Sequence, residues 1–278
     1  MRSLCHIALY TAFSGTLLKA EEPEAKKTDD PLLKGPGLKV NLVAETATIT
    51  PGVPLKVGFH IEHFPGFHTY WLNPGMVGMA TTLDWKLPEG FTASEIRWPA
   101  PENSFMGTYP CHGYERDVTL LVTITPPKTI EAKEVTLTTE AGWMCCARGC
   151  FPGFKTLSLT LPVAGNPVPA PKHQALIEKA EKELPSTNHR LTASLLTKMD
   201  APVIKIRFAG RKDWPAKDIY FFSNDGQISS EHAQKFEPQP DGSVILTIPR
   251  SEFSPEKKTD LPGVLRIGKD SFALTAKP

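Results

Sequence analysis

The chain has 278 residues, of which 31 are Lys or Arg and 30 are Asp or Glu, so it lacks the charge excess that draws proteins to nucleic acids or anionic membranes. With 40% hydrophobic and 22% charged residues, the composition is typical of a globular protein and excludes a disordered one. The 27 prolines interrupt long helices and exclude a helical bundle.

The first twenty residues are typical of an export signal. Arg2 supplies positive charge, residues 7–18 form an uncharged apolar run, and Ala20 is a small residue suited to cleavage. The run is shorter than the ~20 apolar residues that span a bilayer. We therefore predict a signal peptide over residues 1–20, with a buried N-terminal strand as the alternative. This signal predicts that the mature protein is periplasmic, and we expect no transmembrane segment in the mature chain. The charged, proline-bearing residues 21–36 are expected to form a flexible leader.

From residue 37 onward, short runs alternate between apolar and polar residues and are rich in Val, Ile and Thr. Such alternation is typical of half-buried strands, and the intervening PGVP, HFPGFH, LNPG, KLPEG and WPAPEN segments have turn chemistry. The sequence therefore predicts an antiparallel β-sandwich over residues 37–163. Its predicted strands cover residues 38–43, 55–61, 118–124, 135–139 and 156–161.

A proline-rich linker and one helix are predicted over residues 164–190. Four apolar residues recur at helical spacing between residues 172 and 184, and Pro185 ends the pattern. Alternation then returns, with NDG, QPDG and DLPG turns, and predicts a second, smaller β domain over residues 191–278. The strands of that domain are expected at residues 203–208, 219–222, 243–248 and 264–267.

Cysteine is the most informative residue type in this sequence. Removal of Cys5 with the signal leaves Cys111, Cys145, Cys146 and Cys150, which allow three pairings. Outside the cytosol these cysteines are expected to be oxidised, or to be kept reduced by a dedicated partner.

Cys146 and Cys150 lie four residues apart between two predicted strands. On an extended strand they would be about 13 Å apart, whereas a disulfide needs Cα atoms within about 7 Å, so a bond requires a turn that Gly149 permits. So small a ring stabilises the folded chain little, which suits a bond that opens and closes. Arg148 lies inside the loop, where its charge would favour a thiolate.

Two other interpretations of the cysteines remain open. In the first, the disulfides are structural, with Cys145 joined to Cys111 and the Cys146–Cys150 bond acting as a local clip. In the second, the cysteines and His112 bind Cu(I) or Zn, although their spacing matches no common zinc pattern.

Other aromatic and histidine residues are predicted to be structural. Trp71, Trp85 and Trp98 are expected in the sandwich core. Three histidines around the HFPGFH turn are expected to be solvated turn residues rather than a metal cluster: His60, His63 and His68.

Four stretches of the sequence resemble the N-terminal periplasmic domain of the thiol:disulfide interchange protein DsbD and its ScsB-like relatives. They are GFHTYWLNPGMVGMATTLDWKLPEGF, IRWPAPENSFMG with GYERDVTLLVTITPP, EAGWMCCARGC, and FPGFKTLSLTLPV. The resemblance is good over residues 59–163 and looser over residues 191–278.

The resemblance implies an immunoglobulin-like sandwich and a redox pair made of Cys146 and Cys150. Cys150 would form the mixed disulfide with partners, Cys146 would be the resolving thiol, and no metal or organic cofactor would be needed. A membrane thiol reductase and a thioredoxin-like protein would supply electrons. Exported thiol–disulfide proteins would accept them, as in the electron transfer that serves cytochrome c biogenesis.

The resemblance also implies a cap loop over the redox pair. The Phe105-Met106-Gly107 run matches that loop best, so Phe105 would shield the cysteines, and Tyr114 falls where the family has an aromatic residue near the site. Ordinary core or turn positions are the alternatives for both.

Two cysteines depart from the family pattern, and the function also has an alternative. Cys145 beside Cys146 leaves a Cys145–Cys150 pair possible, and Cys111 would either resolve a mixed disulfide or staple the cap. A non-catalytic binding module with structural disulfides is the rival function.

Overall fold

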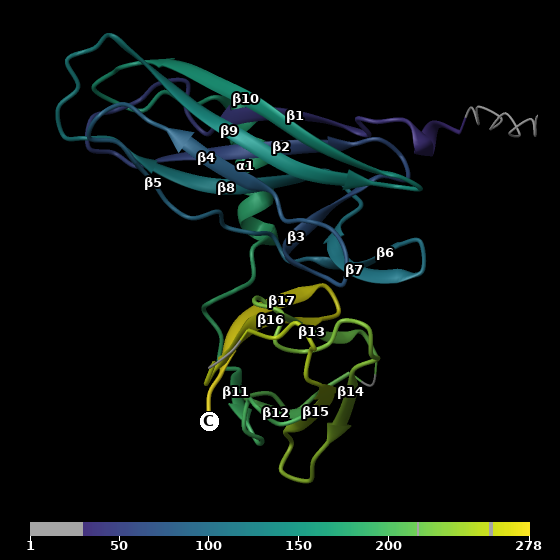
Figure 1. The fold of residues 1–278 in the computed structure, drawn as a ribbon. Coiled ribbons are helices and arrows are strands. Elements are labelled where there is room, and N and C mark those ends of the chain that lie inside the picture. Colours follow the sequence, from purple (N-terminus) through teal and green to yellow (C-terminus); the bar gives the residue numbers. More distant parts are fainter. Residues whose placement is uncertain (1–29, 216, 256–257) are drawn as a thin grey trace, which may run out of the picture.

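The computed structural model describes residues 30–215, 217–255 and 258–278 (Figure 1). The predicted signal peptide, Cys5 and residues 21–29 of the predicted leader lie outside this part. The described chain is mainly β and has one α-helix, with two β domains joined through that helix. Among the described residues, no helix is long and apolar enough to cross a membrane.

The first domain is built from two antiparallel sheets that face each other. One sheet has the order β1-β2-β8-β5, and Phe59 and Ile61 on its central strand point into the core because alternate residues of a strand share a face. This arrangement confirms the predicted sandwich. The bounds of these strands are β1 Leu38–Ala44, β2 Leu55–His63, β8 Val118–Thr125 and β5 Thr92–Ala93.

The other sheet has the order β10-β9-β3-β7-β6, with β4 also paired to β9. The two longest strands, β9 and β10, have 13 residues each and form a hairpin, while β9 shares its other edge between β4 and β3. The strands are β3 His68–Gly75, β4 Thr82–Lys86, β6 Glu102–Met106, β7 Tyr109–Tyr114, β9 Glu134–Cys146 and β10 Cys150–Pro162.

The LNPG segment was predicted to be a turn, and this prediction is wrong. Residues 72–75 belong to β3, whose register with β7 shifts between Tyr70 and Gly75. Gly75 has a φ of +83°, which glycine adopts without a steric cost, so the strand continues through an irregular stretch instead of reversing.

The helix α1 (Pro171–Glu183) packs on the outer face of the β1-β2-β8-β5 sheet. Ile177 and Ala180 are buried there against Val43 and Leu121, on the apolar face that the spacing predicted. Gly58 allows this approach, because a Cβ at that position would lie 3.0 Å from the Ile177 side chain.

The second domain has a core of its own between two small sheets. Phe208 and Phe221 are fully buried there with the alternating apolar residues of the predicted strands. One sheet contains β11 Thr192–Leu195, β12 Val203–Ala209, β15 Val244–Pro249 and β14 Lys235–Pro238. The other contains β13 Ile219–Ser223, β16 Leu261–Ile267 and β17 Asp270–Ala276.

The two domains meet through aromatic side chains. Phe222 of β13 lies with its ring 6.0 Å from Trp71 of β3 and 4.9 Å from His112 of β7. The His112 Nε2 lies 3.2 Å from the Tyr220 hydroxyl, and the Asn73 amide donates to the Ser223 carbonyl at 2.7 Å. The second domain therefore contacts β3 and β7, the strands that continue the sheet beyond the β9–β10 hairpin.

We expect the free energy of unfolding to decrease as the pH falls from about 6.5 to about 4. Burial lowers the pKa of His112 and of His63 to about 4, so the unfolded chain binds protons that the folded chain excludes in this window. For His112 the loss is on the order of 3 kcal/mol, and urea unfolding at a series of pH values measures it.

His112→Gln should remove part of this pH dependence. The matched control is His173→Gln, because His173 lies exposed on α1. An unchanged pH dependence in His112→Gln would show that His112 makes no contribution.

Candidate functional site

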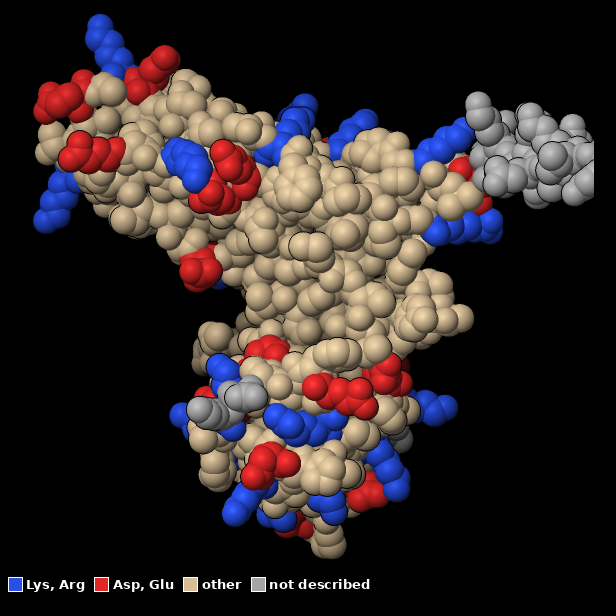
Figure 2. Space-filling view, viewed as in Figure 1, with Lys and Arg blue, Asp and Glu red and all other residues tan. Residues whose placement is uncertain are grey.

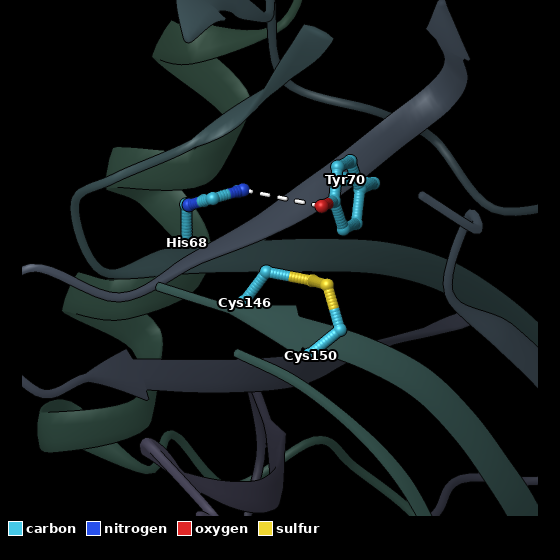
Figure 3. The surroundings of a disulfide bond; sticks show 4 residues. All are labelled: His68, Tyr70, Cys146 and Cys150. Atoms are coloured by element: carbon cyan, nitrogen blue, oxygen red, sulfur yellow. Dashed lines mark hydrogen bonds between the residues drawn. A yellow bond between two sulfur atoms is a disulfide. The ribbon is translucent and has the colours of Figure 1, made fainter. Parts of the chain in front are cut away.

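The β9–β10 hairpin ends in a disulfide between Cys146 and Cys150 (Figure 3). The ladder pairs these two residues directly, with Cα atoms 4.2 Å apart, and the amide of Ala147 donates to the Gly149 carbonyl at 2.9 Å to close the turn. The two strands are paired along their whole length, so the register that places Leu137 in the core also places the two sulfurs opposite each other. The alternative Cys145–Cys150 pair is not formed.

The two cysteines of the disulfide differ in their access to solvent. Cys150 is exposed, whereas Cys146 is fully buried in a small cluster with Tyr70 and Cys111, against which Met106 and Met144 pack. Attack by an external thiolate is therefore directed to the Cys150 side of the bond, and Cys146 is the sulfur that would leave into the protein interior.

Cys145 and Cys111 are free and buried, so the alternative in which a disulfide joins Cys111 to Cys145 is not formed. Neighbouring residues on a strand point to opposite faces, so Cys145 packs in the sandwich core while Cys146 lies on the other face. Burial raises the pKa of Cys145 to about 12 and that of Cys111 to about 11. Both thiols therefore stay protonated, and hence poorly nucleophilic, near neutral pH.

Residues 30–36, the end of the predicted flexible leader, pack against Arg148 and Phe151, at the turn between β9 and β10. A short 3-10 helix, Pro31–Leu33, follows Asp30, whose carboxylate accepts a hydrogen bond from the Arg148 guanidinium at 2.6 Å. A Cβ at Gly35 would lie 2.7 Å from the Phe151 ring, which shows how closely this segment covers the loop. The charge of Arg148 is thus paired with a carboxylate.

The β6–β7 hairpin carries the residues that the resemblance assigns to a cap. The Phe105 side chain is 62% exposed at its tip, whereas the adjacent Met106 packs against the cluster that holds Cys146. The shielding role of Phe105 stays a prediction.

Tyr114 lies in the core of the sandwich, which was the alternative to a position near the cysteine pair. It is fully buried, and its hydroxyl donates to the Pro99 carbonyl at 2.8 Å. Tyr114 and Cys145 both pair with Thr69, and both pack in the core cluster of the sandwich, on the opposite face of the sheet from Cys146.

His68 and Tyr70 lie on the same side of the disulfide (Figure 3). His68 is the ladder partner of Cys146, and its Nε2 is 3.2 Å from the Tyr70 hydroxyl. The side chains are only 4% and 1% exposed, so the prediction that His68 is a solvated turn residue is wrong. His68 is buried because β3 begins there, at the end of the HFPGFH turn.

The other two histidines of this group bind different partners. The His60 Nδ1 lies 2.9 Å from the Thr119 hydroxyl, and His63 lies between the Arg116 carbonyl and the Thr69 hydroxyl. In the described parts of the chain, no three His, Cys, Asp or Glu side chains are grouped closely enough to hold a metal ion.

Tyr70 was not singled out from the sequence, although a signal for it was present. His68 and Tyr70 are two residues apart, so they share a face if they lie on a strand. Because the LNPG segment that follows has turn chemistry, the apolar run before it is too short to predict β3. The sequence therefore does not show that His68 and Tyr70 lie on one strand.

The surface over β3 and the β6–β7 hairpin carries little charge. Figure 2 shows that charged side chains gather at the far end of the sandwich and over the second domain, while the area over β3 and the β6–β7 hairpin has few. Large hydrophobic side chains are exposed on these segments and on the loop that follows β3: Leu72, Met79, Phe105 and Tyr109.

Comparisons with known proteins find a matching family and a similar fold. Residues 39–162 match the family described as "Thiol:disulfide interchange protein DsbD, N-terminal". The fold is similar to the crystal structure of the N-terminal periplasmic domain of ScsB from Proteus mirabilis, with a TM-score of 0.64 and 16% sequence identity. That match covers 87% of this chain and 94% of the other. No curated protein matches the chain.

The difference in burial predicts an order of thiol reactivity. In a Cys5→Ser background, mild reduction should expose one rapidly alkylated thiol, Cys150, because Cys146, Cys111 and Cys145 are all buried. Maleimide labelling followed by peptide mass spectrometry measures this. Rapid labelling of Cys146 in the folded, reduced protein would contradict the assignment, and labelling in urea serves as the control for complete reduction.

Proposed function

Because residues 39–162 match the family of DsbD N-terminal domains, we propose that this chain is an exported, periplasmic thiol–disulfide exchange protein. It relays reducing equivalents to other exported proteins through Cys146 and Cys150. The observation that carries the proposal is the disulfide at the hairpin tip, which has one exposed cysteine and one buried cysteine.

The exchange proceeds through a mixed disulfide. The Cys150 thiolate of the reduced chain attacks a partner disulfide, and one partner sulfur leaves as a thiolate. Cys146 then loses its proton and attacks the Cys150 sulfur, which releases the second partner thiolate and closes the Cys146–Cys150 bond. Two electrons and two protons pass to the partner. A thioredoxin-like protein, fed by a membrane thiol reductase, restores the reduced pair by the reverse steps.

The small ring supports a bond that is made and broken. The two cysteines are four positions apart in the sequence, so the disulfide closes a very short loop. The stabilisation that a disulfide gives through chain entropy grows with loop length, so this bond stabilises the fold little. The paired strands hold the two cysteines opposite each other without it, because the ladder continues from Cys150 to Pro162. Reduction therefore leaves the sulfurs positioned to react again.

The sparsely charged area over β3 and the β6–β7 hairpin suits the docking of partners. Exposed Leu72, Phe105 and Tyr109 lie on the strands and hairpin next to Cys146. Apolar contact, rather than charge attraction, would therefore hold a partner over Cys150.

Cys146→Ser is expected to trap covalent complexes through Cys150. Without the resolving thiol, the mixed disulfide persists and is seen as a band that disappears on reduction. Cys150→Ser should trap far fewer complexes, because the remaining Cys146 is buried. Cys145→Ser, which alters a free buried cysteine on the opposite face, is the matched control. Absence of complexes from Cys146→Ser would favour a binding module with a structural disulfide.

The reduction potential of the Cys146–Cys150 bond should lie above about −300 mV, the range below which disulfides resist reduction by thiol pools. Thiol trapping in dithiothreitol buffers of graded composition measures it. A lower value would identify the bond as structural and would remove the basis for a relay.

A further inference from the structure

Strand β10 has a free edge that begins at Cys150. Its sheet has the order β10-β9-β3-β7-β6, so β9 pairs with one side of β10 and no described strand pairs with the other (Figure 1). The register with β9 runs without a break from Cys150 to Pro162. Unpaired amides and carbonyls along a strand edge are a template for pairing with another chain. β10 therefore offers such a template directly beside Cys150.

The backbone groups of every second residue of β10 point to this free edge. The Cα atoms of Cys146 and Cys150 are 4.2 Å apart, the short spacing of an antiparallel pair that exchanges no backbone hydrogen bonds. The amide and carbonyl of Cys150 therefore point away from β9. The other end of the strand agrees, because the Ile49 amide, from outside the hairpin, donates to the Pro162 carbonyl at 2.9 Å. Pro162 lies an even number of residues after Cys150, so the two share one orientation.

The residues nearest Cys150 suit the addition of a strand. Pro152 has the orientation of Cys150, so the donor that proline lacks is missing from the free edge and not from the ladder with β9. Phe154, at the next such position, presents its amide and carbonyl at the edge, and its side chain is 82% exposed. Charged side chains on an edge oppose pairing, and the first on β10 is the exposed Lys155. The uncharged start of the edge is thus residues 150–154.

A mixed disulfide brings the partner backbone to this edge. The Cα atoms of two joined cysteines lie about 4.4–6.8 Å apart, and those of a hydrogen-bonded antiparallel pair lie about 5.5 Å apart. A partner cysteine joined to Cys150 is therefore within range of a neighbouring strand. Because β9 occupies one side of Cys150, the free edge is the side on which that strand fits.

We propose that an extended, cysteine-containing segment of the partner adds to β10 as an antiparallel strand while the mixed disulfide exists, an inference that rests on the function proposed above. The partner cysteine lies opposite Cys150 and exchanges backbone hydrogen bonds with it. The residue two positions before the partner cysteine donates its amide to the Pro152 carbonyl, and the residue four positions before it pairs with Phe154. The amides of the intervening residues point away from β10.

The test is the stability of a mixed disulfide between Cys150 and a short synthetic peptide, acetyl-TVTVCT-amide. The protein is the full chain with Cys5→Ser and Cys146→Ser, whose other cysteines, Cys111 and Cys145, are buried. Cys150 is first joined to glutathione. The peptide thiolate then bonds to the Cys150 sulfur and glutathione leaves as a thiolate, so one thiol and one disulfide are present before and after exchange. Mass spectrometry of the acid-quenched protein measures the equilibrium constant.

N-methylation of alternate peptide amides should reveal the pairing. A methyl group two positions before the peptide cysteine removes the donor to Pro152 and should lower the equilibrium constant by about threefold to tenfold, the effect of one lost hydrogen bond. A methyl group three positions before the cysteine is the matched control, because that amide points away from β10, and it should leave the constant near that of the unmethylated peptide. Equal constants for the two methylated peptides would overturn the proposal.

Two substitutions of Phe154 test the same edge from the protein side. Phe154→Pro removes an amide that points away from β9, so the β9–β10 ladder is kept, as it is at Pro152. It should lower the constant for the unmethylated peptide below that of Phe154→Ala, which loses the ring and keeps the amide. The same constant in both variants would contradict strand addition. If Phe154→Pro does not fold, the methylated peptides carry the test.

Sedimentation of the wild-type chain distinguishes a partner strand from a second copy of this chain. A dimer that forms in the wild type and is lost in Phe154→Pro would assign the edge to pairing between two β10 strands and would overturn the proposal. Failure of the proposed function looks different, because Cys146→Ser would then trap no exported partner. Failure of strand addition alone leaves those complexes in place and makes the peptide constants equal.

Discussion

The pairing of β9 with β10 is the constraint on which the site depends. The hairpin places Cys146 opposite Cys150 in the ladder, with Cα atoms 4.2 Å apart, so the backbone pairing itself brings the two side chains together. The same register also divides the cysteines of the EAGWMCCARGC segment between two faces, with Cys145 in the sandwich core and Cys146 beside Tyr70. A shift of one residue would exchange these faces and leave the core with a disulfide and the site with a buried free thiol.

β3 connects this hairpin to the rest of the molecule. Its first residues flank Cys146, and its other neighbour in the sheet is β7, which contacts the second domain through His112. Trp71, also on β3, lies between the sandwich core and Phe222 of the second domain. The second domain thus packs on β3, which pairs with β9, and on β7, the next strand of the sheet, which gives it a physical means to hold the Cys146 pocket in place.

The sequence predicted those parts of the structure that depend on short-range pattern. Alternation over residues 55–61 and 118–124 marks strands because each has one face on the core, and the face of α1 follows from the spacing of Ile177 and Ala180. The sequence does not predict β3, because its proline and glycine continue in an irregular strand that pairs with β7 and β9, and such tertiary support leaves no local signal. The spacing of Cys146 and Cys150 raised the prospect of a ring, but the buried state of one cysteine and the exposure of the other depend on which strand packs beside them.

Burial of the resolving cysteine has consequences for how such a pair works. An exposed Cys146 would exchange protons with water and would also be open to attack by any thiol, so both ends of the bond would be targets. Burial leaves a single approach through Cys150, and it removes the solvent that would carry the proton. Met106, Met144 and Val77 pack against the cluster that holds Cys146, and the thiol of Cys111 in that cluster stays protonated because burial raises its pKa to about 11. Selective access therefore follows from the fold, because β3 pairs with Cys146 through His68 while Cys150, at the start of β10, stays exposed.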